Sequence, residues 1–324
     1  MFFRTIIYTA ICIFLFFGLS CSEDRIIFQY EGEGGETIPF NFDDYVPVIP
    51  FAIAKEPGSG SFVVDTGSPI NLVDIGHFDS EAGIETVDAT GLGFFFPGLK
   101  MVFEDWTDDV HLIGGIIGVD LLQHFNWEID YPGKSITLFI EQFTDETTDL
   151  VDFELAGGGR FRAVNGDETN IGPNRHLVQM KVEGENVLCL LDTGASFNVV
   201  SQSLMDKLGW QERPDHGSIE IVTINGIISA PLTEIHDLAF EQLPQETNIK
   251  NTLTTVMDDQ FFFPLYAETG RQIDALLGGT YLSNFKLGFS YPDRTIRISK
   301  EEEIRKSRTQ LPRRMRFPFS LLQK

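Results

Sequence analysis

Short apolar runs separated by turn-forming residues make up most of this chain, and this pattern predicts strands rather than long helices. In the second half, residues 177–182 and 187–191 are apolar, and Gly184-Glu185-Asn186 between them favours a hairpin. In the first half, residues 48–54 and 61–64 flank a turn rich in Pro and Gly in the same way. The pattern therefore predicts an all-β chain.

Helices are expected to be few and short. Residues 120–125 and 280–285 each fit one short helix, and residues 201–208 fit another, for which Ser201 is a suitable N-cap. Tyr-Pro-Gly-Lys at 131–134 and Tyr-Pro-Asp-Arg at 291–294 are expected to be turns, because Pro presets the backbone of a turn.

The two halves of the chain match each other over long stretches. Residues 116–125 align without gaps on 276–285, and residues 128–138 align on 288–298 in the same register, with Gly, Leu, Phe, Tyr, Pro and Ile at identical offsets. Such a match indicates two copies of one unit. Because residues 141–149 are acidic and polar, we place the boundary near residue 147, which gives an N-terminal lobe over 21–147 and a C-terminal lobe over 148–299.

The first 20 residues have the features of a secretory signal peptide. Arg4 precedes an apolar stretch at 5–19, which is shorter than the roughly 20 residues that span a bilayer. Gly18-Leu19-Ser20-Cys21 resembles a bacterial lipoprotein cleavage box, which implies that Cys21 is lipidated and anchors the exported chain to a bacterial membrane. Ordinary secretion with Cys21 free is the alternative. The acidic Ser22-Glu23-Asp24 is typical of export to the outer face of the envelope.

Composition fits two folded lobes, because the chain has 324 residues of which 42% are hydrophobic. Once the signal is removed and Cys21 is modified, Cys189 is the one thiol that remains, so no intrachain disulfide is expected. Cys189 lies in an apolar run, and we expect it to be a small buried hydrophobic residue.

Charge is distributed unevenly along the chain. The formal net charge is −24; residues 21–299 carry −30, whereas the basic tail at 300–324 carries +5. An acidic body repels nucleic acid and favours solubility, so no nucleic-acid partner is expected. The tail could touch a membrane surface, fold back on the acidic body, or remain a solvated end.

Asp-Thr-Gly occurs twice, once in each half, and each copy ends an apolar run. Asp65-Thr66-Gly67-Ser68 follows Phe62 to Val64, and Asp192-Thr193-Gly194-Ala195 follows Cys189 to Leu191. In a duplicated chain, two such elements predict two carboxyl groups facing each other across a pseudo-twofold axis. Carboxyl groups about 3 Å apart cannot both ionise, so the pair holds one proton over a wide pH range. The ionised member can activate a water while the protonated member polarises a carbonyl.

The neighbouring residues have expected roles in the same loops. Gly67 and Gly194 allow the tight turn that presents each carboxyl, and Thr66 and Thr193 can hydrogen-bond across the interface. Ser68 and Ala195 are small enough for the partner loop to approach. The apolar segments that end in Gly118 and Gly278 are expected to lie behind the loops and to support them.

These motifs together resemble those of aspartic peptidases of the retropepsin and pepsin type. Each half resembles one retropepsin-like subunit, and residues 25–299 resemble a bacterial single-chain form in which two subunits are fused. The resemblance implies two homologous β-barrel lobes with the active site between them. It also implies an endopeptidase with Asp65 and Asp192 as the catalytic pair, a peptide or protein substrate, no metal or organic cofactor, and a monomer.

Other readings remain open at this stage. A silent peptide-binding module could keep the same fold, although retention of both Asp residues favours the enzyme. A glycosidase also uses two carboxylates but requires neither duplication nor paired Gly turns. A metal hydrolase is disfavoured because the six His are scattered without a His-Glu-x-x-His spacing.

Two segments are candidates for a hairpin that covers the substrate. Residues 221–229 contain Asn225-Gly226, a pair that favours tight hairpin turns. In the first half, residues 91–98 contain Phe94, Phe95 and Phe96, which either line such a hairpin or pack in an ordinary core.

Overall fold

The computed structural model describes residues 28–43, 45–54, 59–78, 80–106, 113–143, 149–213, 216–223, 226–300 and 315–317. The expected signal peptide, the Cys21 lipidation site, Asn225 and most of the basic tail lie outside these residues. No helix within the described ranges is long and apolar enough to cross a bilayer.

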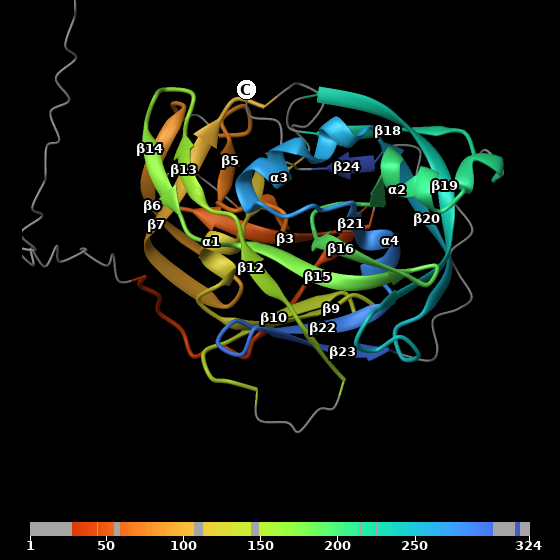
Figure 1. Ribbon diagram of the computed structural model, residues 1–324. Helices are drawn as coiled ribbons and strands as arrows, with labels where there is room; N and C mark the ends of the chain where they lie inside the picture. The colour runs from red at the N-terminus through yellow and green to blue at the C-terminus, as the bar shows by residue number, and fades with distance from the viewer. Residues whose placement is uncertain are drawn as a thin grey trace, which may run out of the picture.

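The first lobe is built on a seven-stranded sheet whose order is β2-β3-β4-β8-β5-β7-β6 (Figure 1). Its middle strand is β8, which pairs in parallel with β4 and antiparallel with β5. The strands are β2 (Asn41–Asp43), β3 (Val46–Ile53), β4 (Ser59–Val64), β5 (Leu72–Asp74), β6 (Gly83–Gly91), β7 (Phe94–Glu104) and β8 (Gly115–Ile117).

The second lobe repeats this arrangement in a nine-stranded sheet, with the order β12-β15-β16-β21-β17-β20-β19-β18-β24. Here β16 pairs in parallel with β21, and β21 pairs antiparallel with β17. The strands are β12 (Glu154–Ala156), β15 (Arg175–Val182), β16 (Glu185–Leu191), β17 (Asn198–Ser201), β18 (Ser218–Thr223), β19 (Gly226–Phe240), β20 (Ile249–Met257), β21 (Ala275–Leu277) and β24 (Met315–Phe317).

A third sheet joins the two lobes. It has six strands in the order β1-β10-β9-β22-β23-β11 and lies beneath both lobes in Figure 1. The link is the antiparallel pair of β9 and β22, in which Trp127 is opposite Phe289. The strands are β1 (Thr37–Pro39), β9 (Asn126–Asp130), β10 (Ser135–Phe139), β11 (Leu150–Asp152), β22 (Phe285–Ser290) and β23 (Thr295–Lys300).

The remaining elements are short. A two-stranded sheet of β13 (Gly159–Arg162) and β14 (Glu168–Ile171) lies outside the three larger sheets. The helical elements are α1 (Val119–Leu122), α2 (Gln202–Lys207), η1 (Trp210–Glu212), η2 (Asp259–Phe262), α3 (Phe263–Thr269) and α4 (Gly279–Leu282). This content confirms the all-β fold class with two β lobes.

The internal repeat of the sequence is also a repeat of structure. In the first copy β8 leads through α1 into β9, and in the second copy β21 leads through α4 into β22. Both helices begin one residue earlier than expected, directly after the extended Gly118 and Gly278. Ser201 caps α2 as expected, because its side chain accepts a hydrogen bond from the Leu204 amide at 3.0 Å.

The stacked aromatic rings of Trp127 and Phe289 fill the middle of the joining sheet. Their ring centroids are 4.1 Å apart and their ring planes are nearly parallel. Both side chains are fully buried. Because one ring comes from each half of the chain, this contact ties the two lobes to one core, which runs through both of them.

The lobes differ in one connection, which leads from β5 to β6 in the first lobe and from β17 to β19 in the second. β7 pairs in parallel with β5, as β20 does with β17, so β6 is the counterpart of β19. The second lobe inserts α2, η1 and β18 between β17 and β19. In the first lobe, residues 75–78 and 80–82 of this connection form turns and bends and contain no strand.

The hairpin at 91–98, which the sequence left as either a cover for the substrate or part of the core, packs in the core. Phe94 and Phe96 are buried against the rings of Phe28 and Phe125. In the second lobe, β18 and β19 form the expected hairpin, with Ile221 opposite Ile228 and Thr223 opposite Gly226.

Replacement of Trp127 by Ala should destabilise both lobes together by about 3–5 kcal/mol, because the substitution leaves a cavity where they join. Urea unfolding followed by circular dichroism measures this change. Val164→Ala is the control, since Val164 is 81% exposed and its loss should change the free energy of unfolding by less than about 0.5 kcal/mol. A cost below about 1 kcal/mol for Trp127→Ala would show that the joining sheet does not hold the lobes together.

Candidate active site

Each Asp-Thr-Gly loop begins where a central strand of its lobe ends. Asp65 follows β4 and its amide donates to the carbonyl of Ile117; Asp192 follows β16 and its amide donates to the carbonyl of Leu277, both at 3.0 Å. Each Asp is thus the last residue held by the parallel strand pair of its own lobe, and each loop leaves its sheet at the same place.

Four hydrogen bonds between Thr66 and Thr193 and the opposite strands lock the two loops together. The Thr66 amide donates to the Thr193 hydroxyl, and the Thr193 amide donates to the Thr66 hydroxyl, each at 3.0 Å. The Thr66 hydroxyl donates to the Leu191 carbonyl at 2.9 Å, and the Thr193 hydroxyl donates to the Val64 carbonyl at 2.7 Å. All of these groups are buried, so the loops, 127 residues apart in sequence, are held at a fixed separation.

The glycines of the motif lie directly against the opposite carboxyl group. A Cβ atom on Gly67 would lie 2.5 Å from Cγ of Asp192, and a Cβ on Gly194 would lie 2.3 Å from Cγ of Asp65. Any larger residue would push the carboxyl groups apart. Sequence analysis attributed these glycines to the tight turn that each loop makes. Their closeness to the opposite carboxyl group is a second reason why both positions require glycine.

The two carboxyl groups are buried and interact with each other. Oδ1 of Asp65 accepts hydrogen bonds from the amides of Gly67 at 2.7 Å and Ser68 at 3.1 Å, and Oδ1 of Asp192 accepts one from Gly194 at 2.9 Å. Neither Oδ2 atom has a donor from the rest of the protein or contact with solvent. Each carboxyl group alters the pKa of the other, so the two are close enough to share one proton.

Burial is the main cause of the altered acidity of this pair. It raises the pKa of Asp65 to about 6, although the Asp192 side chain, the loop amides and the charge of Arg175 act against it. Burial also raises the pKa of Asp192 well above its ordinary value, and the negative charge of Asp65 raises it further. The pKa values of both acids are therefore raised, and the two carboxyl groups hold one proton as a pair.

Two asparagines that sequence analysis missed support the loops from behind. Oδ1 of Asn71 accepts a hydrogen bond from the Gly118 amide at 3.0 Å, and Oδ1 of Asn198 accepts one from the Gly278 amide at 2.9 Å. Each Asn stands six residues after its Asp. That shared offset was visible in the sequence and could have identified the pair.

The expected supports Gly118 and Gly278 do lie behind the loops. A Cβ on Gly118 would lie 2.2 Å from the Ile70 carbonyl oxygen, and one on Gly278 would lie 2.3 Å from that of Phe197. Ser68 and Ala195 contact these supports: their carbonyls accept hydrogen bonds from the amides of Val119 and Gly279. The contacts of Ser68 and Ala195 are thus with their own lobe.

Arg175 is a buried cation that sequence analysis did not identify. Its guanidinium donates to the Gly67 carbonyl and forms a salt bridge at 2.8 Å with Glu268 of α3. Arg175 is 3% exposed. Because Arg175 comes from β15 of the second lobe and Gly67 from the first, this contact places a positive charge beside one carboxyl of the pair only.

Cys189 does not fit a nucleophile at this site. Cys189 is buried, and burial raises the pKa of its thiol far above the usual range, so the expectation of a small hydrophobic residue fits its place. Among the described residues, no cluster of three or more His, Cys, Asp or Glu is placed to hold a metal ion.

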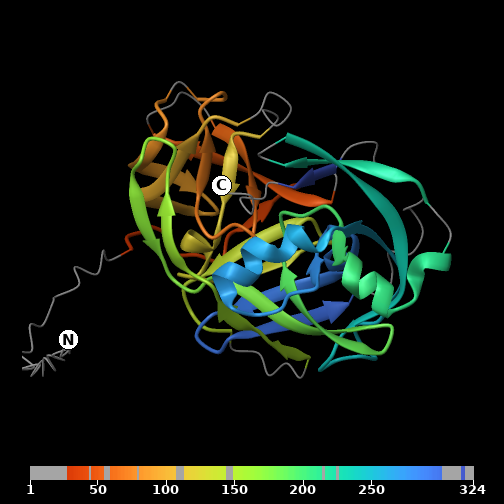
Figure 2. The same ribbon diagram turned by 45° about the horizontal axis from the view of Figure 1, so that its top comes forward.

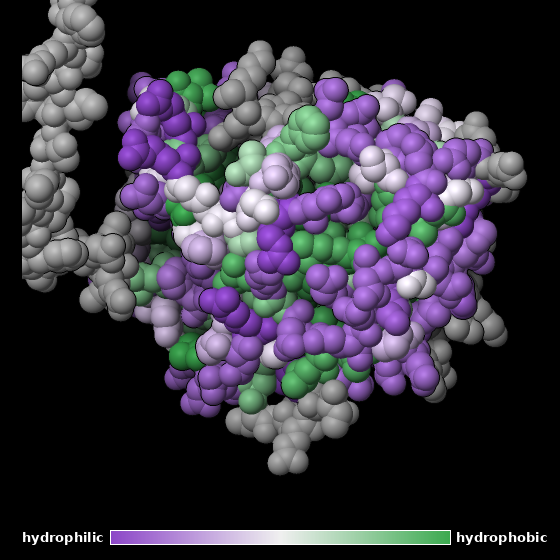
Figure 3. All heavy atoms as spheres, in the orientation of Figure 1, coloured by the Kyte–Doolittle hydropathy of each residue, from purple (hydrophilic) through white to green (hydrophobic). Residues whose placement is uncertain are grey.

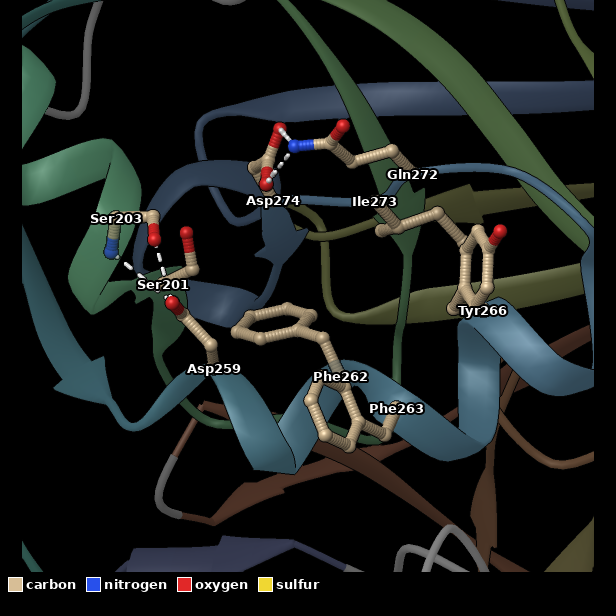
Figure 4. Close-up of a pocket in the computed structure, with 9 residues that line it drawn as sticks. All are labelled: Ser201, Ser203, Asp259, Phe262, Phe263, Tyr266, Gln272, Ile273 and Asp274. Carbon is tan, nitrogen blue, oxygen red and sulfur yellow. Dashed lines mark hydrogen bonds between the residues drawn. The ribbon is translucent and has the colours of Figure 1, made fainter.

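A separate pocket lies in the second lobe, at the far ends of β17 and β21 (Figure 4). Its volume is about 380 Å³, and Ser203 donates a hydrogen bond to Asp259 at its edge. Asn198, at the start of β17, supports the Asp192 loop from behind, whereas Ser201, at the end of β17, lines this pocket. The pocket is therefore distinct from the paired carboxyl groups.

Replacement of Asp192 by Asn should stabilise the protein at pH 7. Because the pKa of Asp192 is raised on folding, its contribution to stability is present below the unfolded pKa near 4 and is lost as pH rises toward the folded value. Asn keeps the shape without this cost, so the free energy of unfolding should increase at pH 7, and the increase should vanish near pH 3.5.

Urea unfolding of both chains between pH 3.5 and 7 measures this difference. Glu33→Gln, at an exposed acidic residue, is the control and should show no such trend. A gain for Asp192→Asn that does not depend on pH would contradict the shared buried proton.

Comparison with known proteins supports an aspartic peptidase family. Residues 178–284 match the family model of the gag-polyprotein putative aspartyl protease. The solved structure of the aspartic proteinase from Irpex lacteus is similar to this chain with a TM-score of 0.50 and 11% sequence identity, over 84% of this chain and 98% of that one. No curated protein sequence matches the chain. The chain thus has the two-lobed fold of a pepsin-like aspartic proteinase, and its second lobe carries the sequence pattern of an aspartyl protease.

Proposed function

We propose that this protein is an aspartic endopeptidase that hydrolyses peptide bonds with a water activated by Asp65 and Asp192. The observation that carries the proposal is the pair of fully buried carboxyl groups, each of which lies against the glycine of the opposite loop. A structural pair of acids would be costly to bury, because neither Oδ2 atom has a hydrogen-bond donor among the described residues.

The charge of Arg175 acts on one acid of the pair, and this difference gives the two acids different roles. Arg175 favours the ionised form of Asp65, whereas Asp192 faces the negative charge of Asp65 and keeps the proton. Asp65 is then the general base that takes a proton from water, and Asp192 is the general acid that donates its proton to the carbonyl oxygen of the peptide.

The reaction balances with these two groups alone. Water adds to the carbonyl carbon, its proton goes to Asp65, and the proton of Asp192 goes to the carbonyl oxygen, which gives a neutral diol. Asp65 then passes its proton to the amide nitrogen while Asp192 regains one from a diol hydroxyl, and the carbon–nitrogen bond breaks. The Thr66 and Thr193 hydrogen bonds hold the acids in place throughout, so little reorganisation is needed.

Replacement of either acid by Asn should reduce peptide cleavage at least about 1,000-fold, because each variant lacks either the base or the shared proton. Incubation with a mixed peptide library across pH, read by mass spectrometry, measures the rates. Circular dichroism and binding of a statine-type transition-state analogue check that the variants are folded. A folded wild-type chain that binds peptides but cleaves none at any pH would instead indicate the silent binding module.

The acidic limb of the pH–rate profile should respond to charge next to Asp65. Arg175→Gln removes the positive charge that favours ionised Asp65, so the pKa of Asp65 rises and the limb moves to higher pH, by roughly 0.5–1 unit. Glu268→Gln removes the negative partner of Arg175 and should move the limb the opposite way. Shifts in the same direction for both variants would show that the effect is structural rather than electrostatic.

A further inference from the structure

A short strand from the basic tail lies beside the hairpin of the second lobe. β24 pairs in parallel with β18, with Met315 opposite Ile221, Arg316 opposite Val222 and Phe317 opposite Thr223. β24 is the last strand of the nine-stranded sheet, so β18 would have an unpaired edge without it. An unpaired edge exposes a row of backbone donors and acceptors that an extended chain can bind.

The position of this strand distinguishes it from an ordinary edge strand. β18 belongs to the insertion that only the second lobe has within the described residues, and in both views β24, in dark blue, lies between this hairpin and the first lobe (Figures 1 and 2). The 14 residues between Lys300 and Met315 can span up to roughly 45 Å, which is ample to bring the tail from the end of β23 to this place.

Charge favours the same placement. Residues 21–299 carry a net charge of −30, whereas the tail from 300 to 324 carries +5. The face of the molecule in Figure 3 is largely hydrophilic around its rim, with hydrophobic residues exposed in the middle. The basic tail and the acidic body therefore attract each other.

The paired carboxyl groups are closed to solvent in this arrangement. Asp65 and Asp192 are both 0% exposed, and their Oδ2 atoms meet neither water nor a donor from the protein. A peptidase that is ready to act must admit a water and a peptide to these atoms.

We propose that the C-terminal tail is a built-in inhibitor, in which residues 315–317 add to the edge of β18 in the place of an extended peptide substrate. The inference rests on the proposed peptidase function, and it implies that the active form takes peptides with basic and aromatic residues like those of the tail. Release of the tail, by cleavage or by a competing partner, frees the edge of β18.

Removal of the tail tests the proposal directly. A chain that ends at Lys300 should cleave a peptide substrate with a kcat/KM at least 10-fold above that of the full chain. A synthetic peptide of residues 309–320 should inhibit the shortened chain competitively, whereas a scrambled peptide of the same composition should not. A chain that ends at Pro318 keeps β24 and is the matched control, with the low rate of the full chain. Equal rates for all three chains would overturn the proposal.

A binding measurement separates this inference from the peptidase function itself. The shortened chain with Asp192→Asn should bind the fluorescently labelled tail peptide, and a statine-type analogue should displace the peptide. Binding without cleavage by any form would reject the peptidase and keep the docking of the tail. Binding of the peptide to anionic vesicles but not to the shortened chain would instead reject the inhibitor.

Discussion

The burial of two carboxyl groups at the junction of the two Asp-Thr-Gly loops is the constraint on which the rest of this structure depends. Two acids in a low-dielectric interior repel each other unless one of them is neutral, and the free energy of keeping them there must come from their surroundings. The surroundings meet that cost with the crossed hydrogen bonds of Thr66 and Thr193, with loop amides on each Oδ1 atom, and with glycines that leave no room between the loops. The third sheet holds the two lobes in the register that these contacts require.

Duplication accounts for the symmetry of the pair, and departures from it account for the chemistry. The asparagines, the supporting glycines and the short helices occur once in each half at equivalent places. Among the described residues, Arg175 and the β18–β19 hairpin occur on one side only. The charge of Arg175 favours the ionised form of Asp65, and the hairpin adds an edge at which β24 pairs.

The elements that the sequence predicted well are those encoded locally. The paired Asp-Thr-Gly loops, the Tyr-Pro turns and the Ser201 cap each depend on a few adjacent residues, and the structure forms them at those positions. The joining sheet was missed, because β9 and β22 are about 160 residues apart and nothing in either strand identifies its partner. Arg175 was missed for the same reason: its contact with Gly67 spans 108 residues. The role of residues 91–98 was undecided, since a Phe-rich hairpin suits a core and a cover equally well until its neighbours are known.

The stacked Trp127 and Phe289 rings make the two halves one folding unit, and this has an evolutionary consequence. An enzyme assembled from two identical chains repeats every substitution on both sides of its centre, and it falls apart when diluted. Here each side is encoded separately and the halves cannot drift apart. Each side can therefore carry a charge or an insertion of its own, as the second lobe does with Arg175 and β18.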